Sequence, residues 1–492
     1  MDRRSASLAA RALLALVLMI GFYIVALGIA FLLLFLPYAE FVYGNRLHPK
    51  LAFFCLVGAA VILWSIMPRW DRFVPPGPAL DAGSQPRLFE LIRGVAGATR
   101  QDMPSEVYLV IDLNASVAQR GGIMGFGSRR VMGLGLPLLQ VLTTSELRAV
   151  LSHEFGHYHG GDTRLGPWIY KTRGAIARTL QGLAGHSSML QKPFLWYGKM
   201  FMRVTLAVSR RQELSADALA ARTVGARPLM DGLRKIHGAA LAMGAYLSTE
   251  VSPVLSAGFL PPIADGFERF MSSEPINRSV SGEVDRVMKE AKSNPYDTHP
   301  PLRERIAALQ GLPAGEPPHE DPPAFTLVAE IQALERQLLA PIAERNAIRD
   351  LKPIRWEEVG ERVYLPQWAE VVRGKAEHFG SLTVSTLPAK AHDVALAIGR
   401  DVAPAGAVFP DEDLIRRGAW FIAAALALAL ARSGWSIRAL VGEPILLTRG
   451  SDTIDTFASA PALASGQMTA ETWQRQCAEL AIADFPLGAP AG

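Results

Sequence analysis

A stretch without charged side chains constrains this chain more than any other feature. Residues 12–39 contain no Asp, Glu, Lys or Arg, and the run exceeds the roughly 20 apolar residues that a helix needs to cross a bilayer. A second run, residues 51–67, lies at the short end of the spanning range. The first run is too long for the apolar core of a cleaved signal peptide, and no clean cleavage site follows it. The sequence therefore predicts a transmembrane helical hairpin.

The orientation of this hairpin follows from its flanking charges. Positive residues outside the two runs are Arg3, Arg4, Arg11, Arg69 and Arg72, against Arg46 and Lys50 in the connecting loop. Because Lys and Arg favour the cytoplasmic side, both ends of the hairpin are expected in the cytoplasm. The only two cysteines, Cys55 and Cys477, give no disulfide framework, which agrees with a reducing compartment.

Composition fits a membrane anchor joined to soluble domains. Of 492 residues, 50% are hydrophobic and 20% are charged, and the net charge of +4 is spread along the chain. A nucleic-acid-binding protein would concentrate its basic residues, so no nucleic-acid partner is expected. The length predicts two or three domains. We expect an anchor at 1–75, a central domain at 76–312, a Pro-rich linker at 313–323 and an accessory domain at 324–492.

The accessory domain contains one very apolar segment, residues 419–431, between Arg417 and Arg432. This segment is too short to span comfortably, so a buried helix is favoured over a third span. Short strand-like runs follow it, which predicts an α+β accessory domain without recognisable chemistry. The whole chain is expected to be mainly α, in the α+β class, with a small β-sheet in its central domain.

The chemistry is carried by a predicted helix that starts near Thr143. Thr143 and Glu146 have the spacing of a capping box. Within the helix lie His153, Glu154 and His157. Residues four apart project from one face, so both imidazoles can reach one ion, and Glu154 lies close enough to contact a water on it. This HExxH arrangement is typical of two zinc ligands with a general base. Surface histidines on an ordinary helix are the alternative explanation.

A catalytic zinc ion needs a third protein ligand and one open position. Residues 209–222 have helical composition and place Glu213 and Asp217 four apart. We predict that Glu213 is the third ligand of a single zinc ion. Asp217, one turn further, would accept a hydrogen bond from the free ring N–H of a ligand histidine. Alone, this pair is equally typical of a solvated helix face.

These motifs resemble the HtpX and CAAX-prenyl-endopeptidase family of membrane zinc metallopeptidases, which belongs to the gluzincins. The resemblance covers roughly residues 40–312. The matching residues are His153-Glu154-Phe155-Gly156-His157, Glu213 with Ala216-Asp217, Thr298-His299-Pro300-Pro301 with Arg305, and Asn114-Ala115-Ser116-Val117. It implies a gluzincin-type metallopeptidase domain, with Asn114 and Ala115 in a substrate-binding edge strand. It also implies that His299 lies near the zinc and stabilises the oxyanion, although a histidine in a turn before two prolines needs no such role.

One departure from the family concerns residues 163–208. The resemblance implies further spans there, but the segment carries several Lys and Arg residues, among them Lys171, Arg173, Arg178, Lys192, Lys199 and Arg203. We therefore expect soluble helices or helices that lie on the membrane surface. This layout favours an HtpX-like domain in the cytoplasm over an enclosed intramembrane chamber.

The implied reaction is zinc-dependent hydrolysis of peptide bonds in protein substrates. Glu154 would take a proton from the attacking water and return it to the leaving amine. Substrate backbone is expected to pair along residues 107–117 as an added strand. The leading hypothesis is a peptidase of the bacterial inner membrane that acts in protein quality control. A metal-free membrane scaffold that binds peptides and a prenyl-protein-processing endopeptidase remain the alternatives, and the oligomeric state is open.

Overall fold

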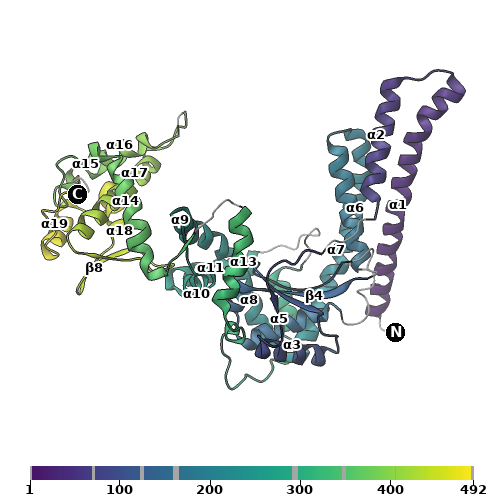
Figure 1. Cartoon of the computed structure of the whole chain (residues 1–492), viewed down its shortest axis with the longest axis horizontal. Coiled ribbons are helices and arrows are strands. Elements are labelled where there is room, and N and C mark those ends of the chain that lie inside the picture. The colour runs from purple at the N-terminus through teal and green to yellow at the C-terminus, as the bar shows by residue number, and fades with distance from the viewer. Residues whose placement is uncertain are drawn as a thin grey trace. The chain divides into compact units, whose positions relative to one another are not determined.

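The computed structural model describes residues 3–68, 73–121, 127–158, 166–290, 297, 299–345, 351–404 and 406–488. Arg69, Arg72 and Thr298 lie outside these ranges. The chain forms two compact units, of which unit 1 comprises Met1–Ala240 and Ser281–Ala340 and unit 2 comprises Leu241–Val280 and Pro341–Gly492. In the described residues, long helices dominate and the sheets are small (Figure 1). The prediction of a mainly α fold is confirmed, whereas the limits of the four predicted domains stay a prediction.

Unit 1 begins with the predicted hairpin. Helices α1 (Arg3–Gly44) and α2 (Pro49–Ile66) pack against each other, and both are long and apolar enough to cross a membrane. Most of the apolar window of α1 is not covered by protein, since only 22% of it is buried. Lipid is the solvent that suits such a surface. The chain is therefore a membrane protein with an N-terminal helical anchor.

Helices α6 (Gly166–Ala184) and α7 (Ser188–Val224) pack along this hairpin (Figure 1). Their apolar side chains join those of α1 and α2 in one cluster; the members from α6 and α7 are Ala175, Ile176, Leu183, Phe194, Tyr197 and Phe201. The Tyr197 hydroxyl donates to the carbonyl of Leu18 at 2.6 Å. The sequence analysis expected soluble helices or helices on the membrane surface and did not predict this packing. The mean hydropathy of a segment conceals an apolar face on one side of a helix.

The sheet of unit 1 has the order β1-β2-β4-β3. Its strands are β1 (Ala79–Leu80), β2 (Glu106–Val110), β3 (Ala115–Arg120) and β4 (Arg129–Gly135). Strand β4 pairs with β2 in parallel and with β3 in antiparallel orientation. The segment 107–117 is thus not one strand. Its first part belongs to β2, an interior strand, and its last part belongs to β3, which lies at an edge of the sheet.

Helices α4 (Leu136–Val141) and α5 (Thr144–Gly156) contact this sheet. The remaining helices with residues in unit 1 are α3 (Pro86–Thr99), α8 (Ala226–Tyr246), α11 (Glu274–Glu290), α12 (Leu302–Leu309) and α13 (Ile331–Arg345), of which α8, α11 and α13 extend into unit 2. Helix α5 lies between α3 and α7 and contacts both. The helix that carries the HExxH motif is therefore held in the middle of the unit.

Unit 2 is built around α17 (Asp411–Arg432). This helix has the length and composition of a span, yet 67% of its apolar window is buried by its neighbours, in agreement with the predicted buried helix. The surrounding elements are α9 (Ser252–Ser256), α10 (Ile263–Ser272), α14 (Leu365–Arg373), α15 (Ala376–Phe379), α16 (Ala391–Asp401), α18 (Thr456–Ala464), α19 (Ala470–Glu479), β5 (Phe259–Leu260), β6 (Lys352–Pro353), β7 (Ser436–Arg438), β8 (Leu446–Arg449) and β9 (Asp452–Ile454). The unit is α+β.

Candidate metal centre

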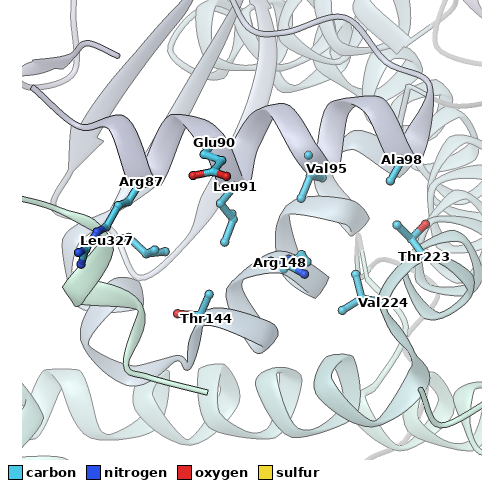
Figure 2. Close-up of a pocket in the computed structure, with 11 residues that line it drawn as sticks. Arg87, Glu90, Leu91, Val95, Ala98, Thr144, Arg148, Thr223, Val224 and Leu327 are labelled. Carbon is cyan, nitrogen blue, oxygen red and sulfur yellow. The ribbon is translucent and has the colours of Figure 1, made fainter. Parts of the chain in front are cut away.

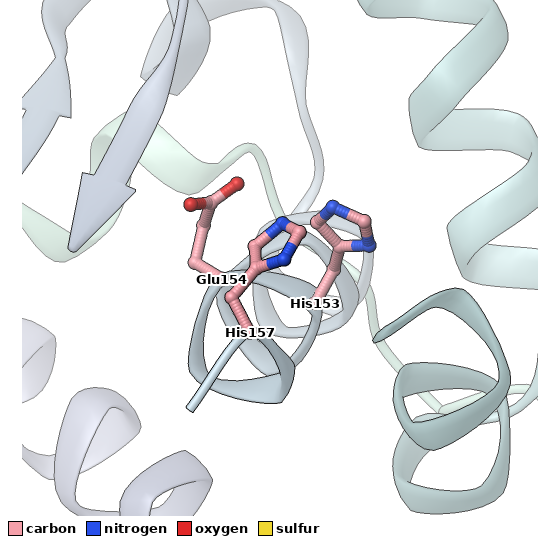
Figure 3. Close-up of side chains that lie close together, drawn as sticks. All are labelled: His153, Glu154 and His157. Carbon is pink, nitrogen blue, oxygen red and sulfur yellow. The ribbon is translucent and has the colours of Figure 1, made fainter. Parts of the chain in front are cut away.

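Helix α5 starts at the predicted position. The Thr143 side chain accepts from the backbone N–H of Glu146, and the Glu146 carboxylate accepts from the backbone N–H of Thr143, which completes the capping box. The helix ends at Gly156, with His157 as its C-cap in right-handed helical conformation. Because the helical turn continues through His157, the imidazoles of His153 and His157 still share a face. Their ring centroids are 4.7 Å apart (Figure 3).

Helix α7 brings Glu213 to this face through a close helix crossing. A side chain at Gly156 would place its Cβ 3.0 Å from the Cα of Ala216, so the two backbones touch where both residues are small. Ala216 lies between Glu213 and Asp217 in sequence, and both acidic side chains are buried with it. The predicted close approach of the two helices is therefore present, and it carries both carboxylates into the interior.

The distances at this crossing fit a tetrahedral ion. Glu213 Oε1 lies 3.4 Å from His157 Nε2, and Glu213 Oε2 lies 3.5 Å from His153 Nε2. Ligand atoms on a tetrahedral zinc ion, with bonds of about 2.0–2.1 Å, are separated by about 3.3 Å. Although His299 Nδ1 is 2.9 Å from Glu213 Oε2, this buried oxygen receives no well-directed hydrogen bond. A carboxylate oxygen that accepts no hydrogen bond and lies close to two imidazole rings is suited to binding a cation.

A second carboxylate orients the first histidine. Asp217 Oδ1 lies 2.8 Å from His153 Nδ1, so this nitrogen donates its proton to Asp217 and leaves Nε2 free to face Glu213. The Asp217 side chain is 1% exposed. Arg305, from α12, donates to both of its oxygens, through Nε at 2.8 Å and Nη2 at 2.6 Å. The role expected for Asp217 has the required geometry, and the bidentate arginine is a partner that the sequence did not reveal.

The charge states of this metal-free cluster follow from burial and hydrogen bonding. Burial disfavours the charged form of His153, but its contacts with Asp217 and Glu213 outweigh this and raise its pKa to about 9. Burial and the neighbouring His153 lower the pKa of His157 to about 4. For Glu213, the nearby histidines outweigh the effect of burial and lower its pKa. The contacts with Asp217 and Glu213 thus favour the protonated form of His153.

Glu154 lies beside the two imidazoles without replacing Glu213. Its carboxylate belongs to a group with His153 and His157 in which the potential ligand atoms lie within 4.8 Å of one another. Figure 3 shows that it extends from α5 on the side facing the sheet, away from the His153 ring. Burial raises its pKa to about 7. A carboxylate with this pKa can accept and release a proton near neutral pH.

His299 is near the cluster but open to solvent. Its Nδ1 lies 2.9 Å from Glu213 Oε2, and 63% of its side chain is exposed. It precedes α12, and Arg305 lies in the first turn of that helix. The chain segment that was singled out by the resemblance therefore contributes two side chains to the cluster, one exposed and one buried.

The edge strand β3 is tied to the end of α5. The Tyr158 hydroxyl donates to the carbonyl of Val117 at 2.6 Å, and burial raises the pKa of Tyr158 to about 12. Ala115 opens β3, whereas Asn114 precedes the strand and its carbonyl accepts from Gly135 N at 2.9 Å. In an antiparallel pair, alternate residues face the partner strand, so Ala115 and Val117 direct their backbone groups to the free edge.

A separate pocket of about 570 Å³ lies elsewhere in unit 1 (Figure 2). Its lining comes from α3, the first turns of α5, the end of α7 and Leu327, and includes Arg87, Arg148 and Thr223. None of the cluster residues described above lines it. The candidate metal site is thus identified by the chemistry of its side chains and not by the volume of a cavity.

Comparisons with known proteins agree with this chemistry. Residues 84–312 match peptidase family M48. A protein named Protease HtpX homolog from Trichormus variabilis is 23% identical over 252 residues, which cover 46% of this chain and 74% of that protein. A protein of the same name from Tropheryma whipplei is 25% identical over 249 residues, covering 47% of this chain and 75% of that protein. No solved structure matches the chain.

Proposed function

We propose that this chain, whose residues 84–312 belong to peptidase family M48, is a membrane-anchored metalloprotease that uses one zinc ion held by His153, His157 and Glu213. Family membership and the apolar hairpin make the protein a membrane metalloprotease. The observation that carries the zinc assignment is the spacing of 3.4 and 3.5 Å between the Glu213 oxygens and the two Nε2 atoms. A zinc ion there would act as a Lewis acid and make the attacking water acidic near neutral pH.

Glu154 is the proposed general base. It follows His153 directly on α5, is half-buried, and has a pKa of about 7, which suits proton transfer in both directions at neutral pH. It would take the proton of the attacking water and pass it to the leaving amine. Glu213 is a much weaker base, because its lowered pKa means that its carboxylate binds a proton poorly.

Asp217 and His299 are proposed to assist in different ways. Asp217 fixes the His153 ring so that Nε2 and not Nδ1 faces the ligand position, a common arrangement for histidine ligands. His299 is open to solvent, and its position next to Glu213 supports a role in stabilising the developing oxyanion.

The substrate is proposed to be an extended protein segment that pairs with the free edge of β3. Ala115 offers its backbone groups there and Val117 its N–H, while the Val117 carbonyl accepts from Tyr158, just after the end of α5. Strand addition recognises the main chain of the substrate more than its side chains, so cleavage of many different unfolded segments is expected. We also propose that the protein acts in protein quality control at the bacterial inner membrane, with the metal centre in the cytoplasm.

A variant of the general base tests this function. Glu154→Gln should keep its zinc and lose casein hydrolysis by about 10²–10⁴-fold, because the amide cannot accept the proton. Zinc content and hydrolysis are measured on the full chain in detergent, with and without a chelator. Normal turnover by Glu154→Gln would remove Glu154 from the reaction. A purified wild type without zinc would instead favour the metal-free scaffold, and faster cleavage of a prenylated peptide than of casein would favour prenyl-protein processing.

A further inference from the structure

The Pro-rich segment between α12 and α13 is fixed at both of its ends. The strap, as we call it, consists of residues 313–323, which were expected to form a linker, and the following Ala324. At its first end, the backbone N–H groups of Ala226 and Arg227 donate to the carbonyls of Pro313 and Ala314, at 2.9 and 3.1 Å. These two amides open α8, directly after α7 ends at Val224.

Two glycines make this first contact possible. A Cβ at Gly225 would lie 2.4 Å from the Ala314 carbonyl oxygen and 2.6 Å from the Cα of Gly315. A Cβ at Gly315 would lie 2.7 Å from the Cα of Gly225. Both residues also have positive φ values, of 110° and 86°, which favour glycine. The backbone of the strap therefore lies directly on the end of α7.

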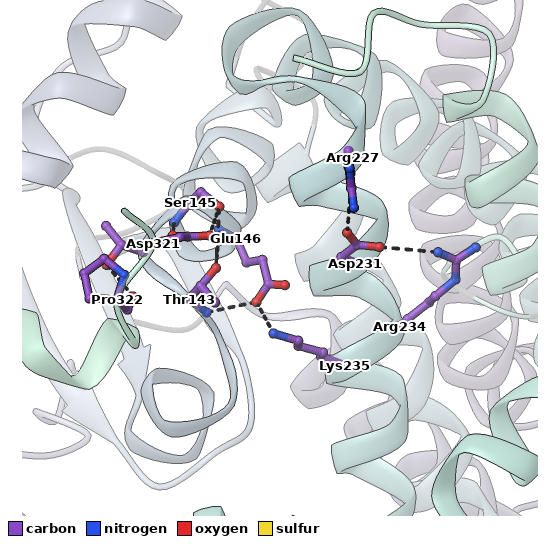
Figure 4. A network of polar contacts seen from close by, with 10 residues as sticks. Thr143, Ser145, Glu146, Arg227, Asp231, Arg234, Lys235, Asp321 and Pro322 are labelled. Carbon is purple, nitrogen blue, oxygen red and sulfur yellow. Dashed lines mark hydrogen bonds and ion pairs between the residues drawn. The ribbon is translucent and has the colours of Figure 1, made fainter. Parts of the chain in front are cut away.

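At its second end the strap binds the start of α5. Asp321 accepts from the backbone N–H of Ser145 at 2.8 Å and from the Ser145 hydroxyl at 2.6 Å. The carbonyl of Pro322 accepts from Thr144 N at 2.9 Å, and Ala324 N donates to the carbonyl of Leu142 at 2.9 Å. Figure 4 shows Asp321 and Pro322 against this first turn, with Lys235 of α8 on its other side. These contacts satisfy helix amides that the capping box leaves open.

The two anchors lie at the far ends of the helices that carry the proposed ligands. His153 lies nine residues after Thr144, which is about 14 Å along a helix. The helices already touch at Gly156 and Ala216, next to the ligands. Helices α5 and α7 also pack against each other directly, and the strap adds a further contact at the ends that lie away from the ligands, which restricts the angle between the two helices. A small change of that angle would separate the imidazoles of α5 from the carboxylate of α7.

We propose that the strap is a positioning element of the metal centre, which joins the end of α7 to the start of α5 and thereby holds His153, His157 and Glu213 at ligand spacing before metal binds. This rests on the ligand assignment of the proposed function. Asp321 is its main positioning residue, since its carboxylate makes two of the contacts to α5 and touches none of the ligands.

The test compares Asp321→Ala with Glu320→Ala, which removes the neighbouring exposed carboxylate. The full chain in detergent is titrated with zinc against a chromogenic chelator, and the thermal unfolding of the zinc-free protein is recorded. Asp321→Ala should raise the zinc Kd about tenfold, at the lower end of what partners of ligands contribute, while Glu320→Ala leaves it unchanged. A wild-type zinc Kd in Asp321→Ala, whatever its thermal stability, would overturn the proposal.

A cleavage experiment covers the case in which Asp321→Ala fails to fold. A site for a specific protease replaces residues 316–319, and the strap is cut after folding. Cutting should raise the zinc Kd by a similar factor, and an unchanged Kd overturns the proposal. The variant His153→Ala tests the ligand assignment separately from the strap proposal. If this variant binds zinc as tightly as the wild type does, the ligand assignment itself is wrong, and the strap proposal fails with it.

Discussion

At the scale of single residues, Arg305 is the side chain on which the geometry of the cluster most depends. It donates two hydrogen bonds to Asp217, which is 1% exposed and in turn holds His153. Without Arg305, a buried carboxylate would lose its bidentate partner, which is costly in the interior, and the His153 ring would lose its fixed orientation.

We expect Arg305→Ala to raise the zinc Kd about 10–100-fold and to lower the unfolding temperature of the zinc-free protein. Arg303→Ala is the control, because this exposed residue lies on the same helix and makes none of the contacts of the cluster. Zinc titration and differential scanning calorimetry measure the two effects. Equal zinc affinity in both variants would mean that Asp217 holds His153 without help.

Tyr158 is the second residue with an unpredicted contact. Its hydroxyl bonds the Val117 carbonyl on the free edge of β3. Tyr158→Phe removes this bond, which contributes roughly 0.5–1.5 kcal/mol, and loosens the strand on which substrate is proposed to pair. The KM for a long peptide should rise several-fold while kcat stays within about twofold. An unchanged KM would argue against β3 as the substrate edge.

At the scale of elements, the first turn of α5 depends on pH through Asp321. Burial opposes the ionised form, but the hydrogen bonds from Ser145 prevail and lower the pKa of this carboxyl below its ordinary value of 3.8. A carboxyl whose pKa is lower in the folded state stabilises the fold above its unfolded pKa and loses this effect as pH falls through the folded pKa.

The unfolding temperature of Asp321→Asn should therefore lie below that of the wild type near neutral pH. The difference should shrink as pH falls below about 3.8, where the wild-type carboxyl becomes protonated. Thermal unfolding of both proteins across this range measures it, with Glu320→Gln as a control that should show no such trend. A difference that is constant with pH would show that the charge of Asp321 does not matter.

At the scale of the whole molecule, the anchor is more than the two apolar helices. Helices α6 and α7 bury Ile176, Phe194 and Phe201 against α1 and α2. A truncated chain, residues 76–492, would expose this face to water. We expect it to aggregate or remain with membranes although both predicted spans are gone. Fractionation after expression tests this, and a soluble monomer would contradict it.

Unit 2 likewise cannot be separated at the Pro-rich segment. Trp356 packs in its interior against Tyr246, and a Cβ at Gly266 would lie 2.5 Å from the Trp356 ring. Because Tyr246 and Gly266 precede the strap in sequence, the fragment 324–492 lacks part of this packing. It should unfold at a lower temperature than a form co-expressed with residues 241–280. Equal unfolding curves, followed by Trp fluorescence, would contradict this.

Local sequence alone determined the elements and most of the cluster. The capping box of Thr143 and Glu146 set the start of α5, the spacing of His153 and His157 placed both on one face, and the uncharged run at 12–39 determined the anchor. These features depend on helix periodicity, capping and burial in lipid, which act within a few turns of chain.

Only the tertiary structure decided which distant groups meet. Arg305 reaches Asp217, Tyr158 reaches Val117, α6 and α7 line the hairpin, and the strap joins two helix ends. No local pattern specifies these partners, because each contact depends on how helices cross and on which small residues let two backbones touch. The sequence alone specified which residue types could bind a metal ion, whereas the packing of the helices determined the distances between those residues.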